Sequence, residues 1–298
     1  MADLEVLCVG SATHDTIAVT DRYPSEDSRV EARAIVTAGG GPAATAAVAL
    51  ARLGIAVGFA GVVGDDDTGR AVRRGLEAEG VDTRWLVGGG THTGASVIVV
   101  SGDASRTIFT RPAPMPAPES IPVDAAPWIH VDQTGYPAVA AARSAGLRAR
   151  ISIDAGNPVP ALALRDVALY APTRSALLER YPGDVDRALD RAHADGAAAV
   201  VMTDGARGAR YSGGGARGAV PAVEVDAVST LGAGDVFHGA LLAGIVGGGD
   251  LGSATALASW VAARSCLALD GRSAIPFRDD VHAEYSAQTH RERGDHAR

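Results

Sequence analysis

Short apolar runs alternate with helical patterns along most of the chain. The apolar runs have the length and composition of buried strands and occupy residues 4–10, 57–63, 128–131, 151–154, 167–171 and 198–203. Helical patterns lie at 42–53, 67–79, 137–145, 184–194 and 250–269. This alternation predicts an α/β fold, a three-layer doubly wound and mostly parallel sheet with helices on both faces. Ligands of such sheets bind beyond the carboxyl ends of the strands.

Two segments interrupt the alternation. Residues 16–38 hold polar turns between β-like pieces, and residues 93–111 have the pattern of a hairpin. We expect them to form a small β lid over the carboxyl edge of the sheet, within a single domain that spans residues 1–298. The polar residues 286–298 are expected to be a disordered tail.

Composition excludes several classes of function. The net charge is −8 and no long basic run occurs, which argues against a nucleic-acid or membrane partner. Cys8 and Cys266 have neither metal-ligand nor redox spacing, so a reducing cytoplasm is the expected location and no metal site is predicted on the protein itself. The N-terminus lacks a basic n-region, and no stretch of 18 apolar residues predicts a membrane helix.

Residues 229–242 carry the most informative motif. Gly232, Ala233 and Gly234 precede Asp235, and an apolar run with helical spacing follows. A glycine-rich turn that opens a helix leaves N–H groups free to hold a phosphate. An aspartate in the first helical turn can take the proton of an attacking hydroxyl. The motif therefore indicates phosphoryl transfer to an alcohol.

The motif from Thr230 to Leu242 resembles the second signature of the ribokinase-like (PfkB) carbohydrate kinases. The turn Gly39, Gly40 and Gly41 and the helix that contains Thr45 resemble the first signature, with Ala44 in place of the usual Asn. The resemblance implies ATP-dependent phosphorylation of a hydroxymethyl group on a sugar or sugar derivative. Asp235 would be the general base and the Gly232–Gly234 turn the anion hole.

The resemblance also assigns the two ligands to parts of the chain. Asp15 would bond sugar hydroxyls together with Gly39, Gly40, Gly41 and Thr45, and the lid would close over the sugar and pair two copies in a homodimer. ATP with Mg²⁺ would lie along the 203–208 loop. The implied nucleotide residues are Thr203, Gly205, Gly208, Thr230 and, in the closing loop 271–276, Gly271.

A third glycine-rich run has a different interpretation. Residues 213–218 fit the pattern G-x-G-x-x-G, but a β-like piece with a proline follows where the dinucleotide motif needs a helix. We interpret these glycines as a hairpin tip.

Two positions depart from the family pattern. Ser229 replaces the acid that helps relatives to hold a monovalent cation, which argues against activation by K⁺. Thr173 and Ser175 stand where relatives carry the Asn-x-x-Glu motif that organises Mg²⁺, and Glu179 lies about a turn too far along. Either Mg²⁺ is held by the ATP phosphates alone or turnover is poor.

Within the family the motifs are most similar to those of the sulfofructose kinases. In that register Arg29 stands at one sulfonate-binding position, Thr134 and Thr110 replace the expected Arg and Asn, and Arg106 and Arg111 are nearby. We include Arg29 and Arg106 among the candidate substrate-binding residues. The motifs do not fix the substrate, and two alternatives stay open: a nucleoside kinase and a catalytically weak sugar- or nucleotide-binding protein.

Overall fold

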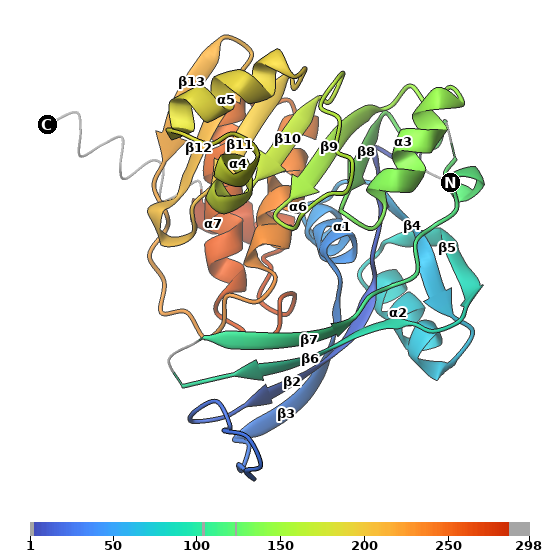
Figure 1. Cartoon of the computed structure of the whole chain (residues 1–298), viewed down its shortest axis with the longest axis vertical. Coiled ribbons are helices and arrows are strands. Elements are labelled where there is room, and N and C mark those ends of the chain that lie inside the picture. Colours follow the sequence, from blue (N-terminus) through green and yellow to red (C-terminus); the bar gives the residue numbers. More distant parts are fainter. Residues whose placement is uncertain (1–2, 103–104, 123, 286–298) are drawn as a thin grey trace, which may run out of the picture.

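A nine-stranded sheet runs through the centre of the computed structural model, which describes residues 3–102, 105–122 and 124–285 (Figure 1). The strand order is β13-β12-β11-β10-β9-β8-β1-β4-β5. The bounds are β1 Val6–Val9, β4 Val57–Gly64, β5 Asp82–Gly90, β8 Trp128–Val131, β9 Arg150–Ala155, β10 Leu169–Pro172, β11 Ala199–Thr203, β12 Ala209–Gly213 and β13 Ala216–Val220. All neighbours from β11 to β5 pair in parallel, whereas β12 pairs antiparallel with both β11 and the edge strand β13. The mostly parallel sheet is thus confirmed.

Helices cover both faces of this sheet because the strands are apolar on both faces. The bounds are α1 Pro42–Arg52, α2 Asp67–Ala78, α3 Tyr136–Ser144, α4 Arg174–Arg180, α5 Val185–Ala194, α6 Ala233–Val246, α7 Leu251–Ser265 and α8 Arg278–Asp280. Val6 and Cys8 of β1 belong to the core under α1, α6 and α7, whereas the alternate residues Leu7 and Val9 belong to the core under α3, α4 and α5.

Most predicted elements are present, and β5, α4 and the three-residue α8 are among the observed elements that were not predicted. The strand β5 was missed because it begins with charged residues and ends in three glycines, which removes the apolar signal at both ends. The helix α4 has seven residues, too few for a clear period. The glycines at 214 and 215 form the tip of the β12–β13 hairpin, as predicted.

The two interrupting segments form a second sheet of four strands, in the order β3-β2-β6-β7, which projects beyond the carboxyl edge of the main sheet (Figure 1). The bounds are β2 Thr13–Val19, β3 Ala34–Gly40, β6 Gly94–Val100 and β7 Arg106–Arg111. Ile17, Ile98 and Val100 of this lid pack with Leu231 and Leu269 of the body. The small β lid of the predicted fold is therefore confirmed, while part of its 101–105 turn and the 286–298 tail lie outside the described residues.

One buried carboxylate joins the elements at the centre of the carboxyl edge. Asp132, directly after β8, is fully buried. Its Oδ2 accepts from the Ser11 N–H and hydroxyl, both at 2.8 Å, and from the Ala43 N–H in the first turn of α1 at 3.3 Å. Its Oδ1 accepts from the N–H groups of Thr134 and Gly135 at 2.8 and 2.9 Å. These bonds tie the ends of β1 and β8 to the starts of α1 and α3.

No helix in the described part of the chain is long and apolar enough to cross a membrane.

The Asp132 cluster yields a prediction for stability. Asp132→Asn keeps the shape but replaces one acceptor oxygen with a donor, which faces buried N–H groups. We expect the free energy of unfolding to fall by about 3 kcal/mol. Urea denaturation measures the change. Asp67→Asn, at an exposed ion pair with Arg70, is the control and should change the value by less than about 0.5 kcal/mol. Equal effects of the two substitutions would contradict the assigned role.

Candidate active site

The start of α6 is open to an anion. Gly232 adopts φ 71°, a left-handed conformation, and no side chain caps the helix. By contrast α2, α4, α5 and α7 are each capped by a side chain, those of Asp66, Thr173, Asp184 and Asp250. The Ala233 N–H makes only a long bond of 3.4 Å to the Thr230 carbonyl. The first N–H groups of α6 and the helix dipole are therefore available to a negatively charged ligand.

Asp235 lies in the first turn of α6 and keeps only part of its surface exposed. Burial raises the pKa of this carboxyl to about 8, and the charges of Asp154 and Asp132 act in the same direction. His238 and Arg272 oppose the rise. Asp235 is thus a carboxyl group whose protonation changes near neutral pH, which is the property a general base needs.

A buried ion pair lies one helical turn behind Asp235. His238 Nδ1 is 2.9 Å from Asp154 Oδ2 at the end of β9, and both side chains are almost fully buried. Burial by itself lowers the pKa of His238, but the charge of Asp154 and its hydrogen bond outweigh it and raise the value. His130, whose ring is centred 6.3 Å from that of His238, has a pKa lowered to about 4 by burial. Asp154 therefore favours the protonated form of His238, whereas burial favours the neutral form of His130.

A second carboxylate faces the same region from the lid. Asp15 of β2 is buried and accepts from the Thr13 hydroxyl at 2.8 Å, and Ser96 of β6 also bonds it. Burial raises the pKa of Asp15, while these bonds and Arg272 limit the rise. Gly40 lies opposite, and a Cβ at that position would overlap the Asp15 carboxylate. The glycine turn thus leaves room for a carboxylate that can accept hydroxyl bonds.

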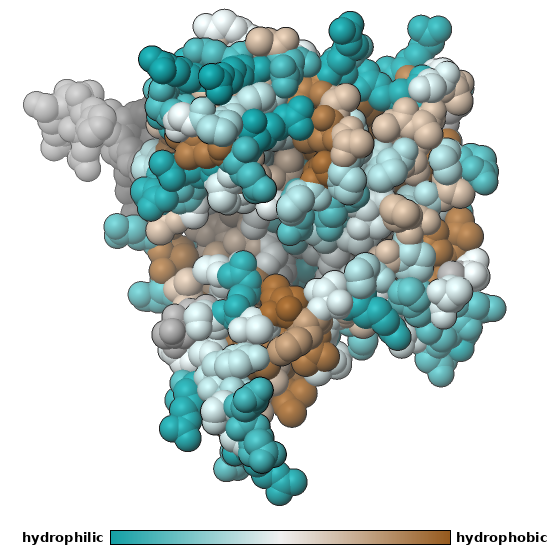
Figure 2. Space-filling model, viewed as in Figure 1, coloured by the Kyte–Doolittle hydropathy of each residue, from teal (hydrophilic) through white to brown (hydrophobic). Residues whose placement is uncertain are grey.

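A pocket of about 960 Å³ opens beside the start of α6. Four of the predicted nucleotide residues line it, namely Thr203, Gly205, Gly208 and Thr230. Ala233, Gly234 and Phe237 of α6 complete the side next to Asp235. The volume suits a nucleotide-sized ligand. The space-filling view shows the surface hollowed between the body and the lid (Figure 2).

This chain belongs to the pfkB family of carbohydrate kinases. The family matches residues 3–155 and 169–278. The chain is 28% identical to the ribokinase of Bacillus subtilis, over 93% of this chain and 97% of the relative. It is 33% identical to the ATP-dependent ribose-1-phosphate kinase of Halopiger xanaduensis, over 94% and 97%. The crystal structure of the ribokinase from Thermotoga maritima matches with a TM-score of 0.83 at 21% identity, over 94% of this chain and 98% of that one. The activity class of the chain is therefore ATP-dependent phosphorylation of a sugar or nucleoside.

The structure places the candidate substrate-binding residues Arg29 and Arg106 apart from Asp15, the carboxylate predicted to bind the sugar. Arg29 is exposed in the loop beyond the far ends of β2 and β3, away from Asp15. Arg106, at the start of β7, lines the 960 Å³ pocket, and its Nη1 donates to the Thr230 hydroxyl at 2.6 Å. Thr110, four residues along the same strand, lies 3.5 Å from the Ser96 hydroxyl. The lid therefore reaches both the Asp15 cluster and the 960 Å³ pocket, with Arg106 at the pocket.

The remaining candidates lie close to these two regions. Gly41 begins α1 and Thr45 accepts a bond from Arg272 Nε at 3.1 Å. Gly271 packs directly against Gly232, where a Cβ on Gly232 would lie 3.0 Å from the Gly271 Cα. The closing loop thus contacts the turn that opens α6.

Four polar residues of the site were not identified from the sequence: Asp132, Asp154, His238 and Arg272. Asp132 directly follows a predicted strand and Asp154 ends another. Since ligands bind at the carboxyl ends of parallel strands, these positions could have identified both aspartates as site residues. His238 and Arg272 gave no local signal, because their partners are remote in sequence.

The described residues offer little to either metal ion that the family implies. Within them no group of three or more His, Cys, Asp or Glu side chains could hold a metal. Thr173 caps α4 and bonds Ser175 at 3.1 Å, and Glu179 is exposed. Ser229 is buried with its hydroxyl accepting from the Leu231 N–H. Position 229 therefore offers no carboxylate to a monovalent cation, and the described residues form no cage for a divalent ion.

The raised pKa of Asp235 yields a prediction for stability against pH. The folded protein keeps a proton on Asp235 up to about pH 8, whereas the unfolded chain releases it near pH 3.9. The folded state therefore binds more protons in this window, and stability falls as the pH rises through it. Asp235→Asn removes this titration.

We expect Asp235→Asn to be stabilised relative to the parent by about 4 kcal/mol more at pH 9 than at pH 5. Urea denaturation of both proteins at the two pH values tests this. A stability difference that does not change with pH would show that Asp235 titrates normally.

Proposed function

We propose that this enzyme transfers the γ-phosphoryl group of ATP to a hydroxymethyl group of a sugar or sugar derivative. The observation that carries the proposal is the position of Asp235. It lies at the uncapped start of α6, beside the 960 Å³ pocket. The charge of Arg272 interacts both with Asp235 and with Asp15 of the lid, which relates the two carboxylates in space. A general base, an anion-binding helix start and a hydroxyl-binding carboxylate are the parts that this reaction needs.

The proposed chemical step uses Asp235 as general base. The Asp235 carboxylate accepts the proton of the hydroxymethyl group, the alcohol oxygen forms a bond to the γ-phosphorus, and the bond from that phosphorus to the β,γ-bridging oxygen breaks to release ADP. The N–H groups of Ala233, Gly234 and Asp235 stabilise the negative charge on the transferring group. A base whose pKa lies near 8 combines useful basicity with partial ionisation at neutral pH.

ATP fits the pocket that Thr203, Gly205, Gly208 and Thr230 line. Arg106 is the cationic side chain among the lining residues, and it reaches the pocket from the lid. Since the described residues form no metal cage, we propose that Mg²⁺ enters on the ATP phosphates, where it neutralises charge. K⁺ has no part in the proposed mechanism.

The proposed acceptor lies between Asp15 and Asp235. The resemblance to sulfofructose kinases makes a sulfosugar one acceptor to test, although Arg29 lies away from Asp15.

One observation favours a nucleoside as second candidate. Val36 and Ile108 share the inward lid face with Ile17 and Ile98 and are 36% and 44% exposed, which gives an apolar surface for a base.

We also propose that the lid pairs two copies of the chain. The outward face of the lid alternates with the inward one and carries Ile35, Val97 and Phe109, which are 68%, 51% and 55% exposed. Val97 and Phe109 are direct cross-strand partners, with the smaller Ala18 and Val99 next to them. Hydrophobic side chains gather over the lid strands in Figure 2. A self-complementary contact with a second copy would bury this face.

The proposed base is tested by Asp235→Asn. We expect kcat to fall by at least about 100-fold, because the amide cannot accept the proton, while calorimetry shows ATP bound as by the parent. The activity is first located by an ATP-consumption screen of sugars, sugar acids, sulfosugars and nucleosides with Mg²⁺. In the parent, kcat/KM for the acceptor should rise with pH to a plateau above about pH 8.

Asp186→Asn, in the exposed part of α5, is the matched control and should retain full activity. A fully active Asp235→Asn variant would show that Asp235 is not the general base. Ligands that raise the melting temperature without any ATP consumption would favour a binding protein instead.

The proposed dimer is tested by Val97→Glu. A charge on the outward lid face should convert a dimer to a monomer in sedimentation equilibrium, because it would be buried without a partner. Ile108→Glu removes a similar apolar side chain from the inward face of the neighbouring strand and should leave the mass unchanged. A parent protein that sediments as a monomer would rule the dimer out.

A further inference from the structure

Arg272 reaches from the closing loop into the region between the lid and the body. Its Nε donates to the Thr45 hydroxyl at 3.1 Å, and its Nη2 donates to the Gly40 carbonyl at 2.7 Å. These two bonds, to α1 and to the end of β3, fix the plane of the guanidinium. The residue is only partly buried, which leaves some of its surface accessible.

The third guanidinium nitrogen, Nη1, lies over Gly39, where a Cβ would overlap it. Only a residue without a side chain can therefore stand at position 39 while Nη1 keeps this place. Burial lowers the pKa of Arg272 to about 10, and the carboxylates of Asp15 and Asp235 are its main opposing charges. The guanidinium thus stays charged at neutral pH and stands between the lid carboxylate and the carboxylate on α6.

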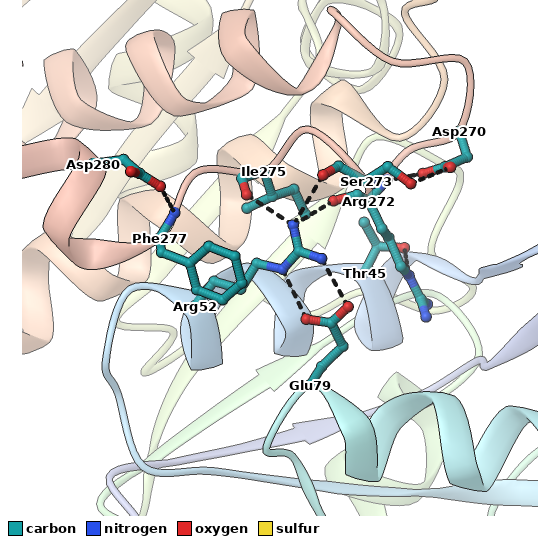
Figure 3. A network of polar contacts seen from close by, with 9 residues as sticks. All are labelled: Thr45, Arg52, Glu79, Asp270, Arg272, Ser273, Ile275, Phe277 and Asp280. Carbon is teal, nitrogen blue, oxygen red and sulfur yellow. Dashed lines mark hydrogen bonds and ion pairs between the residues drawn. The ribbon is translucent and has the colours of Figure 1, made fainter. Parts of the chain in front are cut away.

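The backbone that carries Arg272 is held by a second arginine (Figure 3). Arg52, at the end of α1, forms a two-bond ion pair with Glu79, both bonds being 2.8 Å, and its side chain is 9% exposed. Its Nη1 also donates to the carbonyls of Arg272 and Ile275 at 2.8 Å and of Ser273 at 3.3 Å. Three carbonyls of one loop therefore converge on a single fixed cation.

Asp270 fixes the other side of the loop by accepting from the N–H groups of Arg272 and Ser273 at 2.8 and 2.6 Å. Both the N–H and the carbonyl of Arg272 are thereby bonded to charged side chains. Such bonds are stronger and more directional than neutral ones. The direction in which the Arg272 side chain leaves the loop is set by Arg52 and Asp270.

We propose that Arg272 is a substrate-binding residue that donates through Nη1 to an oxygen of the acceptor next to its reacting hydroxymethyl group, and that Arg52 is the positioning residue of Arg272. The proposal rests on the proposed function and narrows its substrate class. The acceptor must offer a hydroxyl hydrogen to Asp15 and, on a neighbouring carbon or in the ring, an oxygen lone pair to Arg272. Vicinal oxygens of a sugar meet both demands, whereas a simple alcohol meets only one.

Arg272→Met and Arg272→Gln test the first half of the proposal. With D-ribose, D-fructose and the best acceptor from the screen, we expect KM for the acceptor to rise about 10- to 100-fold, since a charge-assisted bond is lost. KM for ATP should change less than about 3-fold, because the pocket for ATP does not contain Arg272. Arg272→Lys should recover only part of the loss, since a lysine cannot bond Thr45, Gly40 and the acceptor in one plane.

The second half is tested by a double-mutant cycle. Arg52→Gln should raise the acceptor KM in the parent but add nothing in the Arg272→Met background, because Arg52 acts through Arg272. Arg143→Gln is the matched control. Arg143 also holds loop carbonyls, those of Arg165 and Asp166, but on α3, and its loss should leave KM unchanged. Additive effects of Arg52→Gln and Arg272→Met would assign Arg52 a purely structural role.

Thermal shift with D-ribose and D-fructose separates failure of this inference from failure of the proposed function. If these sugars stabilise the parent but not a folded Arg272→Met, Arg272 contacts the sugar even where no ATP is consumed. If Arg272→Met binds and phosphorylates the acceptor like the parent while Asp235→Asn is inactive, the inference is wrong and the function stands. If no sugar stabilises the parent and none is phosphorylated, both are wrong.

Discussion

The arrangement of the site depends on the buried carboxylate of Asp132. It accepts N–H or O–H bonds from Ser11, Ala43, Thr134 and Gly135, and so fixes the end of β1, the start of α1 and the start of α3 around one point. The chain from Ser11 continues directly into β2 and the lid. The lid carboxylate Asp15 is therefore only a few residues from this anchor, which sets its position relative to the main sheet.

The carboxylates near this edge have different partners, and the partners decide what each can do. Asp132 is surrounded by N–H groups, Asp154 is paired with His238, and Asp15 is bonded by hydroxyls. Asp235 accepts no such bond from the described residues, and its pKa is raised to about 8 by burial and by Asp154 and Asp132. Within the described part of the chain, Asp235 therefore has the fewest hydrogen-bond partners of the four carboxyl groups and is the one suited to exchange a proton. Different partners can thus give neighbouring carboxyl groups different functions.

The sequence predicted the features that depend on neighbouring residues. The alternation of strands and helices, the open glycine start of α6 and the two lid segments follow from local period and turn chemistry. The contacts of Arg272 with Thr45 and Gly40 join residues more than 200 positions apart, and no local pattern encodes them. Arg106 was grouped with the sugar residues because it lies in the lid, yet its position at the start of β7 brings it to Thr230.

The body and the lid carry different parts of the proposed site. In the proposed mechanism, the base Asp235, the start of α6 and most of the 960 Å³ pocket belong to the body, whereas Asp15 belongs to the lid of β2, β3, β6 and β7. Arg272 and Arg106 both form hydrogen bonds between body and lid: Arg272 reaches from the body to the Gly40 carbonyl, and Arg106 reaches from the lid to Thr230. Substitutions on the inward lid face, such as at Val36 or Ile108, can change which acceptor fits without moving Asp235. In the proposed mechanism, these two arginines would hold the lid at a fixed position relative to Asp235, whichever acceptor binds.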